Sequence, residues 1–496
     1  MVFSSPLFLF LFLPMTLLIG LSLKNTQVRN VFLLIVSMLF YAWGEGVFLL
    51  LMLLSILINY FFAYLIEDTR PENKRLIAPG TALAYGVIAN LALLVFFKYA
   101  NFIVDNLNYL VVYAGFEKIA MKEVHLPLGI SFYTFHSLSY IIDLYRKQTK
   151  GEFSDVKKAN LPNLALYIMF FPQLVAGPII RYHDVATQLL TRATTIDKFA
   201  SGVRRFVMGL GKKVLIANAM AGVADKIFDI KGNDLTAQLA WLGIVAYSLQ
   251  IYFDFSGYSD MAIGLGRMFG FEFLENFNYP YISKSIREFW QRWHISLSRW
   301  FRDYLYLPLG GNRVGTGRLY LNLLIVFFCT GFWHGSSWNF VVWGLFHGLF
   351  MVIERLGLER VLKRLWSPIA HVYALGVVLV GWVFFRADTF AYSADFLRAM
   401  AGMGHGNGIV HPIGAYLSNE ILITLPVAIC VSTPVVPYIG RLFDRVKLQL
   451  EGNLFLSDMY KFSMSGLYIV FLFLVLLASS MSLATGTYNP FIYFRF

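Results

Sequence analysis

An ionisable side chain, His334, ends an apolar run of the sequence. The run over 320–333 carries no charged residue, and Gly335 follows the histidine directly. Ionisable groups at membrane depth are costly to desolvate and are usually functional. An imidazole can also accept a proton from a reacting group near neutral pH. The position of His334 therefore predicts a functional residue, with a hydrogen-bonded core histidine as the alternative.

The residues after His334 predict a helix that breaks inside the membrane. Gly335 is suited to cap the C-terminus of one helix, and Ser336 and Ser337 are suited to cap the N-terminus of the next. Broken backbone at this depth is tolerated only where protein or a water-filled cavity surrounds it. We therefore expect His334 to face a cavity.

A cationic and aromatic block over 287–304 contains the second candidate, His294. Its aromatic residues recur at three- and four-residue steps, and its polar residues occupy the adjoining face. The pattern predicts one amphipathic helix with His294 on the polar face. By itself, such a helix is typical of a membrane interface, where tryptophans enter the headgroup region and arginines extend to phosphates.

The composition indicates a membrane protein. Of the 496 residues, 58% are hydrophobic and 14% are charged, whereas globular chains carry roughly 25% charged residues. Apolar runs that approach the length needed to cross a hydrocarbon core of ~30 Å recur along the chain. They predict an all-α polytopic protein with roughly eleven to thirteen membrane helices, organised as one domain over 1–496. The predicted spans are 5–23, 31–52, 79–99, 160–180, 240–253, 318–333, 338–353, 369–385, 413–439 and 464–483.

The charge pattern predicts the orientation of the chain. The net charge of +12 is spread over short loops and does not indicate nucleic-acid binding. The first loop, 24–29, carries two cations and no acid, so it is predicted to be cytoplasmic, with the N-terminus in the periplasm. The basic stretches 204–213 and 355–364 are predicted to be cytoplasmic as well. Cys329 and Cys430 lie in apolar runs without metal-site spacing, so we expect neither a disulfide nor a metal.

Two carboxylates, Asp254 and Asp260, lie in an apolar segment. Buried acids need partners or must take up a proton. Arg267 and Arg181 are the predicted cationic partners, and ion-pair scaffolding is favoured over contact with a substrate. Small residues in this segment should allow close helix packing; they are Gly257, Gly264 and Gly266.

Two further segments, 126–146 and 170–182, combine proline and glycine breaks with polar side chains in apolar sequence. The polar residues are His136, Asp143, Gln173 and Arg181. They either line a passage or mark packing kinks. His347, in the helix that follows His334, is expected to be a packed core residue.

The blocks W-Q-R-W-H-I-S-L-S at 290–298 and F-W-H-G at 332–335 resemble the membrane-bound O-acyltransferase family, and most closely its bacterial branch that serves alginate O-acetylation. The resemblance runs from M-V-F-S-S at the start to N-P-F-I-Y-F-R-F at the end and is densest between 126 and 348. It implies a bundle with broken or re-entrant helices around a central reaction chamber. It also implies that His334 is the catalytic residue and that His294 supplies a second polar group.

The activity implied by this resemblance is acyl transfer to a hydroxyl, in the bacterial inner membrane. Acetyl-CoA is the expected donor, and no bound cofactor is expected. The expected acceptor is an exported polysaccharide, with alginate preferred and cellulose or another envelope glycan as the alternative. The implied partners are a periplasmic SGNH-type acetyltransferase, accessory alginate-acetylation subunits, the polysaccharide synthesis and export complex, and membrane lipid.

In this chemistry His334 takes the proton of the attacking hydroxyl. His294 is the first candidate to donate to the oxyanion, ahead of Asn339 or a tryptophan N–H. No G-x-S-x-G elbow occurs, so a serine acyl-enzyme is not indicated, while an acyl-histidine stays open. Two other hypotheses remain at this point. One is a proton-coupled transporter, against which the absence of an inverted repeat argues, and the other is a lipid-directed acyltransferase.

Overall fold

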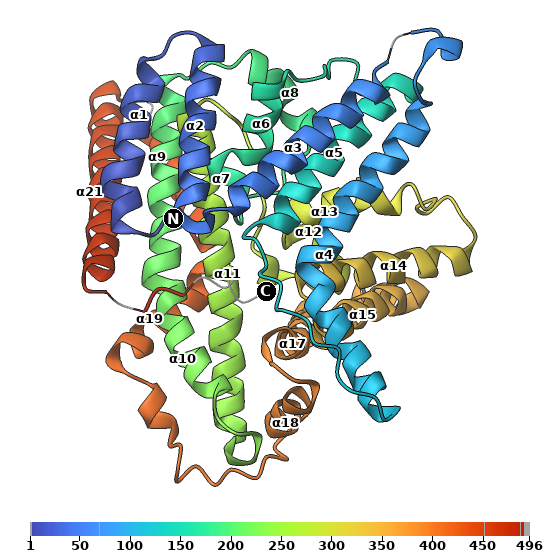
Figure 1. Ribbon diagram of the computed structural model, residues 1–496. Helices are drawn as coiled ribbons and strands as arrows, with labels where there is room; N and C mark the ends of the chain where they lie inside the picture. The colour runs from blue at the N-terminus through green and yellow to red at the C-terminus, as the bar shows by residue number, and fades with distance from the viewer. Residues whose placement is uncertain (1, 69, 451, 487, 491–496) are drawn as a thin grey trace.

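The computed structural model describes residues 2–68, 70–450, 452–486 and 488–490. In these ranges every regular element is helical, which confirms the all-α prediction (Figure 1). The first helices are α1 (Leu13–Ser22), α2 (Thr26–Glu45), α3 (Phe48–Ile66), α4 (Pro79–Tyr113), α5 (Ile130–Lys150), α6 (Leu161–Met169), α7 (Phe171–Leu174), α8 (Tyr182–Leu190), α9 (Ile196–Gly211), α10 (Asn218–Phe228) and α11 (Ala237–Met268). The remaining helices are α12 (Ile286–Arg292), α13 (Ile295–Phe301), α14 (Thr316–His334), α15 (Trp338–Ile353), α16 (Glu359–Leu362), α17 (Ser367–Arg386), α18 (Phe390–Met400), α19 (Asn419–Val431), α20 (Val435–Leu450) and α21 (Leu454–Ala484). The last part of the family resemblance, 491–496, lies outside the described residues.

Eight helical stretches of the described chain are long and apolar enough to cross a membrane, or nine if the bent pair α19 and α20 forms one span. They are α2, α3, α4, Ile196–Phe228, α14, Trp338–Leu362, α17 and α21. A polytopic membrane protein is therefore confirmed, with fewer candidate spans than the roughly eleven to thirteen predicted.

Several predicted spans take another form in the structure. Pro172 divides the segment 160–180 into α6 and α7. The segment 240–253 is the first half of the 32-residue α11, whose second half contains the acids Asp254 and Asp260. Conversely, Ile196–Phe228 qualifies as a span, although its basic residues had indicated a cytoplasmic face. Its cations could be accepted at this depth because acids of α11 pair with them.

Three ion pairs join the long helix Ile196–Phe228 to α11. The Lys213 ammonium lies 2.8 Å from the Asp254 carboxylate. The Asp260 carboxylate lies 2.7 Å from the Arg205 guanidinium and 2.6 Å from the Lys212 ammonium. The predicted ion-pair scaffold is thus confirmed, and it supplies the partners that buried charges require.

The predicted partners of these acids were wrong. Arg267 donates instead to the Ser201 hydroxyl at 3.0 Å. Arg181 pairs with Asp184, at 2.8 Å, and with Asp303. The true partners lie on a facing helix, and sequence spacing does not identify which helix packs against α11.

Glycines bring these two helices into backbone contact. A Cβ added to Gly202 would lie 2.6 Å from the Gly264 carbonyl oxygen, and one added to Gly209 would lie 2.6 Å from the Gly257 carbonyl oxygen. The close packing predicted for Gly257 and Gly264 is therefore confirmed. Gly266 instead faces the ring of Phe273.

Helices α14 and α15 form a second closely packed pair, an antiparallel hairpin that runs across the direction of α9 and α11 (Figure 1). A Cβ added to Gly344 would lie 3.0 Å from the Cα of Gly331 and would collide with the Phe327 carbonyl oxygen. The hairpin turns at 335–337, so the position of His334 depends on this contact.

We predict that Gly344→Ala lowers the stability of the hairpin, because the new methyl group has no room. Overpacking of this kind costs roughly 1–3 kcal/mol. Gly376→Ala in α17 is the matched control, because nothing lies within 4 Å of the added Cβ and alanine is the better helix former. Thermal unfolding of both variants in detergent tests the prediction. Equal midpoints for the two variants would contradict it.

Candidate active site

His334 is the last residue of α14, and 7% of its surface is exposed. Gly335 continues in extended backbone, with φ −162°, and α15 begins after Ser337. The predicted break in the helix is therefore confirmed. Glycine at 335 is required by packing and not by a left-handed cap, because the ring of Phe340 occupies the place where a Cβ would lie. The Ser337 side chain does not cap α15.

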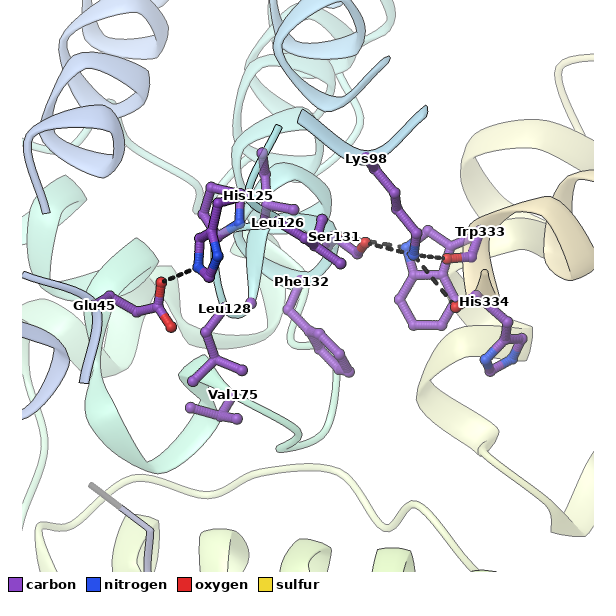
Figure 2. Close-up of a pocket in the computed structure, with 13 residues that line it drawn as sticks. Glu45, Lys98, His125, Leu126, Leu128, Ser131, Phe132, Val175, Trp333 and His334 are labelled. Carbon is purple, nitrogen blue, oxygen red and sulfur yellow. Dashed lines mark hydrogen bonds and ion pairs between the residues drawn. The ribbon is translucent and has the colours of Figure 1, made fainter. Parts of the chain in front are cut away.

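A cavity of about 320 Å³ reaches His334 (Figure 2). On one side it is lined by Glu45 and His125, whose carboxylate and ring nitrogen lie 3.7 Å apart, and the His125 side chain is 65% exposed. On the opposite side lie Trp333 and His334. The other lining residues are Lys98, Leu126, Pro127, Leu128, Gly129, Ile130, Ser131, Phe132 and Val175. The prediction that His334 faces a cavity is confirmed.

His294 lies at a break in the tryptophan-rich block. The block forms two short helices, α12 and α13, and His294 joins them with a left-handed backbone, φ 44°. The prediction of one continuous helix over 287–304 was therefore wrong. The break is held by Asn276, whose backbone carbonyl accepts from the Ile295 N–H at 2.9 Å and whose side-chain oxygen accepts from the Ser296 N–H at 3.2 Å.

The tryptophans of this block are buried in the protein. Trp290, Trp293 and Trp300 are each less than a tenth exposed. Trp300 stacks on Phe135 of α5, with ring centroids 3.7 Å apart. The interfacial-helix alternative was therefore wrong, because these rings pack against other helices and not against headgroups. The spacing of the aromatic residues could not distinguish a buried helix from an interfacial one, since both need an aromatic stripe.

Asn276 also determines the tautomer of His294. The Ser296 backbone N–H can only donate, so it fixes the Asn276 side-chain oxygen on the side of His294, and the side-chain nitrogen donates to the Ser259 hydroxyl at 3.0 Å. His294 Nδ1 lies 3.2 Å from this oxygen, and the oxygen can only accept. Nδ1 therefore carries the proton and Nε2 the lone pair. Within the described residues, the buried Nε2 has no hydrogen-bond partner, which is costly for a buried polar atom.

The fold brings the two candidate histidines together. Their ring centroids lie 6.4 Å apart, and the ring of Trp333 lies within 6.2 Å of His294 and 4.8 Å of His334. Trp343 and Phe385 pack against the other side of the His334 ring, which makes no hydrogen bond in the described part of the chain. His294 is fully buried and does not line the cavity. The cavity therefore gives access to His334 and not to His294.

The other predicted polar residues lie away from this cavity. Asp143 accepts hydrogen bonds from Tyr304, at 2.7 Å, and from the His183 backbone, at 3.1 Å. Gln173 donates to the Tyr167 carbonyl. These contacts, and the burial of His136, favour the packing-kink interpretation of 126–146 and 170–182. The segments still contribute backbone and apolar side chains, such as Ile130 and Val175, to the cavity wall.

Two further residues of the α14–α15 hairpin make contacts away from the cavity. His347 is fully buried between aromatic rings, 5.3 Å from both Trp343 and Trp290, as expected for a core histidine. Asn339 donates to the Ala387 carbonyl at 2.6 Å and does not line the cavity. Neither side chain reaches the space next to His334.

Lys98 of α4 is a cavity residue that sequence reasoning missed. Its ammonium donates to the Ser131 hydroxyl at 3.1 Å, to the His334 carbonyl at 3.3 Å and to the Trp333 carbonyl (Figure 2). Lys98 is the lone charge within the predicted span 79–99. That isolation is the signal that could have identified it, because an unpaired cation in an apolar run is expensive.

Comparison with known proteins places these features in one family. The model of the membrane-bound O-acyltransferase family matches residues 23–385, which include both histidines and all the cavity residues. A probable alginate O-acetylase of Pseudomonas putida is 41% identical over 518 aligned positions, across 100% of both chains. A peptidoglycan O-acetyltransferase of Helicobacter pylori is 37% identical over 82% of this chain and 81% of its own. A teichoic acid D-alanyltransferase of Bacillus subtilis is 29% identical over 53% of this chain and 69% of its own.

The relatives share acyl transfer, although the transferred group and the acceptor differ among their names. With a match that covers most of the sequence and a relative alignable from end to end, the chain belongs to the membrane-bound O-acyltransferase family, and the protein is a polytopic membrane O-acyltransferase.

Proposed function

We propose that this protein transfers acetyl groups from cytoplasmic acetyl-CoA for the O-acetylation of an exported polysaccharide, with alginate as the acceptor. Three relatives that are 41%, 46% and 46% identical carry the name of a probable alginate O-acetylase, and one of them aligns over the whole chain. The peptidoglycan O-acetyltransferase of H. pylori makes another envelope glycan the second candidate acceptor. The transporter hypothesis is not favoured, because the family and the named relatives are acyltransferases.

The observation that carries this proposal is the position of His334 among the residues that line a cavity, with its ring centroid 6.4 Å from that of a second buried histidine, His294. A hydroxyl is a poor nucleophile at neutral pH, and a base that takes its proton can accelerate the attack by roughly 10²–10⁴-fold. The His334 ring has no competing hydrogen-bond partner in the described part of the chain, so its nitrogens are available for this step.

His294 has a more restricted role than the sequence implied. In the tautomer set by Asn276, Nε2 is an acceptor. His294 can therefore donate to an oxyanion only in its protonated form, after its Nε2 has received a proton. We assign it to the same reaction chamber, where its unpartnered Nε2 lies among the rings around His334.

The geometry of α2 supports acceptor entry from the periplasm. The helix starts at Thr26, within the cationic segment 24–29, and ends at Glu45, which lines the cavity. Its 20 residues rise by about 30 Å, which matches the hydrocarbon thickness. If the cationic loop is cytoplasmic, the cavity opens on the periplasmic side of the inner membrane. This arrangement suits a periplasmic SGNH-type acetyltransferase and accessory subunits as partners, next to the polysaccharide export complex.

We predict that His334→Gln lowers acetyl transfer by at least about 100-fold, as expected for loss of a general base. His347→Gln is the matched control, because it alters a buried histidine of the same hairpin that does not reach the cavity. Transfer from radiolabelled acetyl-CoA to polysaccharide, measured in membranes with equal amounts of folded protein, gives the comparison. A His334→Gln protein with more than about a tenth of wild-type activity would exclude this role.

A second prediction concerns cooperation between the two histidines. If they act on one transition state, His294→Ala lowers transfer, and the double variant is no less active than His334→Ala alone, because groups acting as a unit lose their effect together. The same assay measures both single variants and the double variant. Losses that multiply in the double variant would mean that His294 acts at a separate step.

A third prediction concerns the donor. Purified protein in nanodiscs should bind acetyl-CoA or hydrolyse it slowly, and this should weaken at high salt, since exposed cations are screened. Calorimetry and thiol release provide the two measurements, with S-acetylpantetheine, which keeps the thioester but lacks the nucleotide and its phosphates, as the uncharged comparison. Absence of binding and of turnover, with the periplasmic partner present, would indicate another donor.

A further inference from the structure

Helix α4 provides hydrogen-bond donors to the end of α14. Its adjacent residues Lys98 and Tyr99 both contact the segment 332–334: the Tyr99 hydroxyl donates to the Phe332 carbonyl at 2.6 Å, and its ring stacks on the Phe332 ring at a centroid distance of 4.0 Å. Lys98 donates to the next two carbonyls, those of Trp333 and His334. Two neighbouring side chains thus hold three successive carbonyl groups.

These contacts complete the hydrogen bonding of a helix end. The last four carbonyls of any α-helix lack partners within the helix, and the apolar core of a membrane offers no water in their place. Here the Gly331 carbonyl accepts from the Gly335 N–H at 3.4 Å, and α4 supplies donors for the other three. The Lys98 ammonium also meets the negative end of the helix dipole.

We propose that Lys98 is a positioning residue for the O-acyltransferase reaction, fixing the end of α14 so that the His334 ring is held at the cavity. This inference rests on the proposed role of His334. An ammonium has three N–H groups, and Lys98 directs them to the Trp333 carbonyl, the His334 carbonyl and the Ser131 hydroxyl. None is left for a reacting carbonyl, so Lys98 acts through His334.

The carbonyl that Lys98 holds is close to the ring that is proposed to act, so a shift of one moves the other. The His334 backbone carbonyl and the His334 ring belong to the same residue, at the last position before the chain leaves the helix. A shift of about 1 Å in a catalytic group can cost about 10²-fold in rate. Loss of the ammonium frees two carbonyls at this position, and the end of α14 then has no other described donor for them.

The test uses the full-length protein and its acetyl-transfer assay. Lys98→Ala should lower kcat by about 10–100-fold and leave KM for acetyl-CoA nearly unchanged. Lys98→Arg should restore a large part of kcat, because it keeps a cation with N–H donors. Lys98 lines an open cavity, so propylammonium added to the purified Ala variant should raise kcat several-fold, whereas 1-propanol should not. Lys118→Ala, which alters an exposed lysine beyond α4, should match wild type and show no response to the amine.

The outcomes separate this inference from the proposed function. An inactive wild type would overturn the proposed function, and a His334→Gln protein with more than about a tenth of wild-type activity would overturn the role of His334 on which this inference rests. An active wild type with normal kcat in Lys98→Ala, or a loss that appears only in KM, would overturn the positioning role alone. So would a loss that neither Lys98→Arg nor propylammonium recovers, since Lys98 would then serve folding only. If Lys98→Ala yields no monodisperse protein, Lys98→Met retains the apolar stem and is assayed against the same criteria.

Discussion

The central constraint in this structure is that a helix ends inside the apolar core. A terminus at this depth leaves carbonyl groups without partners in the helix, and α4 satisfies three of them with a cation and a hydroxyl. The break places His334 at the helix end, where its ring can face open space beside it. The cavity, the hairpin turn and the intramembrane lysine are therefore consequences of one interrupted helix.

The second histidine is held by a separate framework. Ion pairs and glycine contacts fix α11 against the helix Ile196–Phe228, and the chain that leaves α11 carries Asn276. That residue fixes both the left-handed turn and the protonated nitrogen of His294. The two imidazoles thus approach each other from independent supports, one on α14 and one between α12 and α13. Rigid supports of this kind are what a preorganised site requires.

Much of this architecture could be predicted from the sequence, and the failures have physical causes. The break at His334 was predictable, because glycine and serine follow an uncharged run. The break at His294 was not, because W-H-I-S contains no glycine or proline and the turn is imposed by Asn276, which lies 18 positions earlier. Cationic partners were predicted for Asp254 and Asp260, but the wrong residues were named, since pairing depends on which helices face each other. Lys98 was overlooked because a single cation does not reveal its acceptors until the helix end opposite it is known.

The cavity stops at His334, and aromatic rings close the space behind it. The rings of Trp333, Trp343 and Phe385 surround the His334 ring, with centroids 4.8, 5.1 and 5.3 Å from it, and His294 is fully buried. A small ion entering such an apolar wall would lose its hydration shell without gaining a partner, at a high free-energy cost. The rings of Trp333, Trp343 and Phe385 therefore form an apolar barrier to small ions around the His334 imidazole.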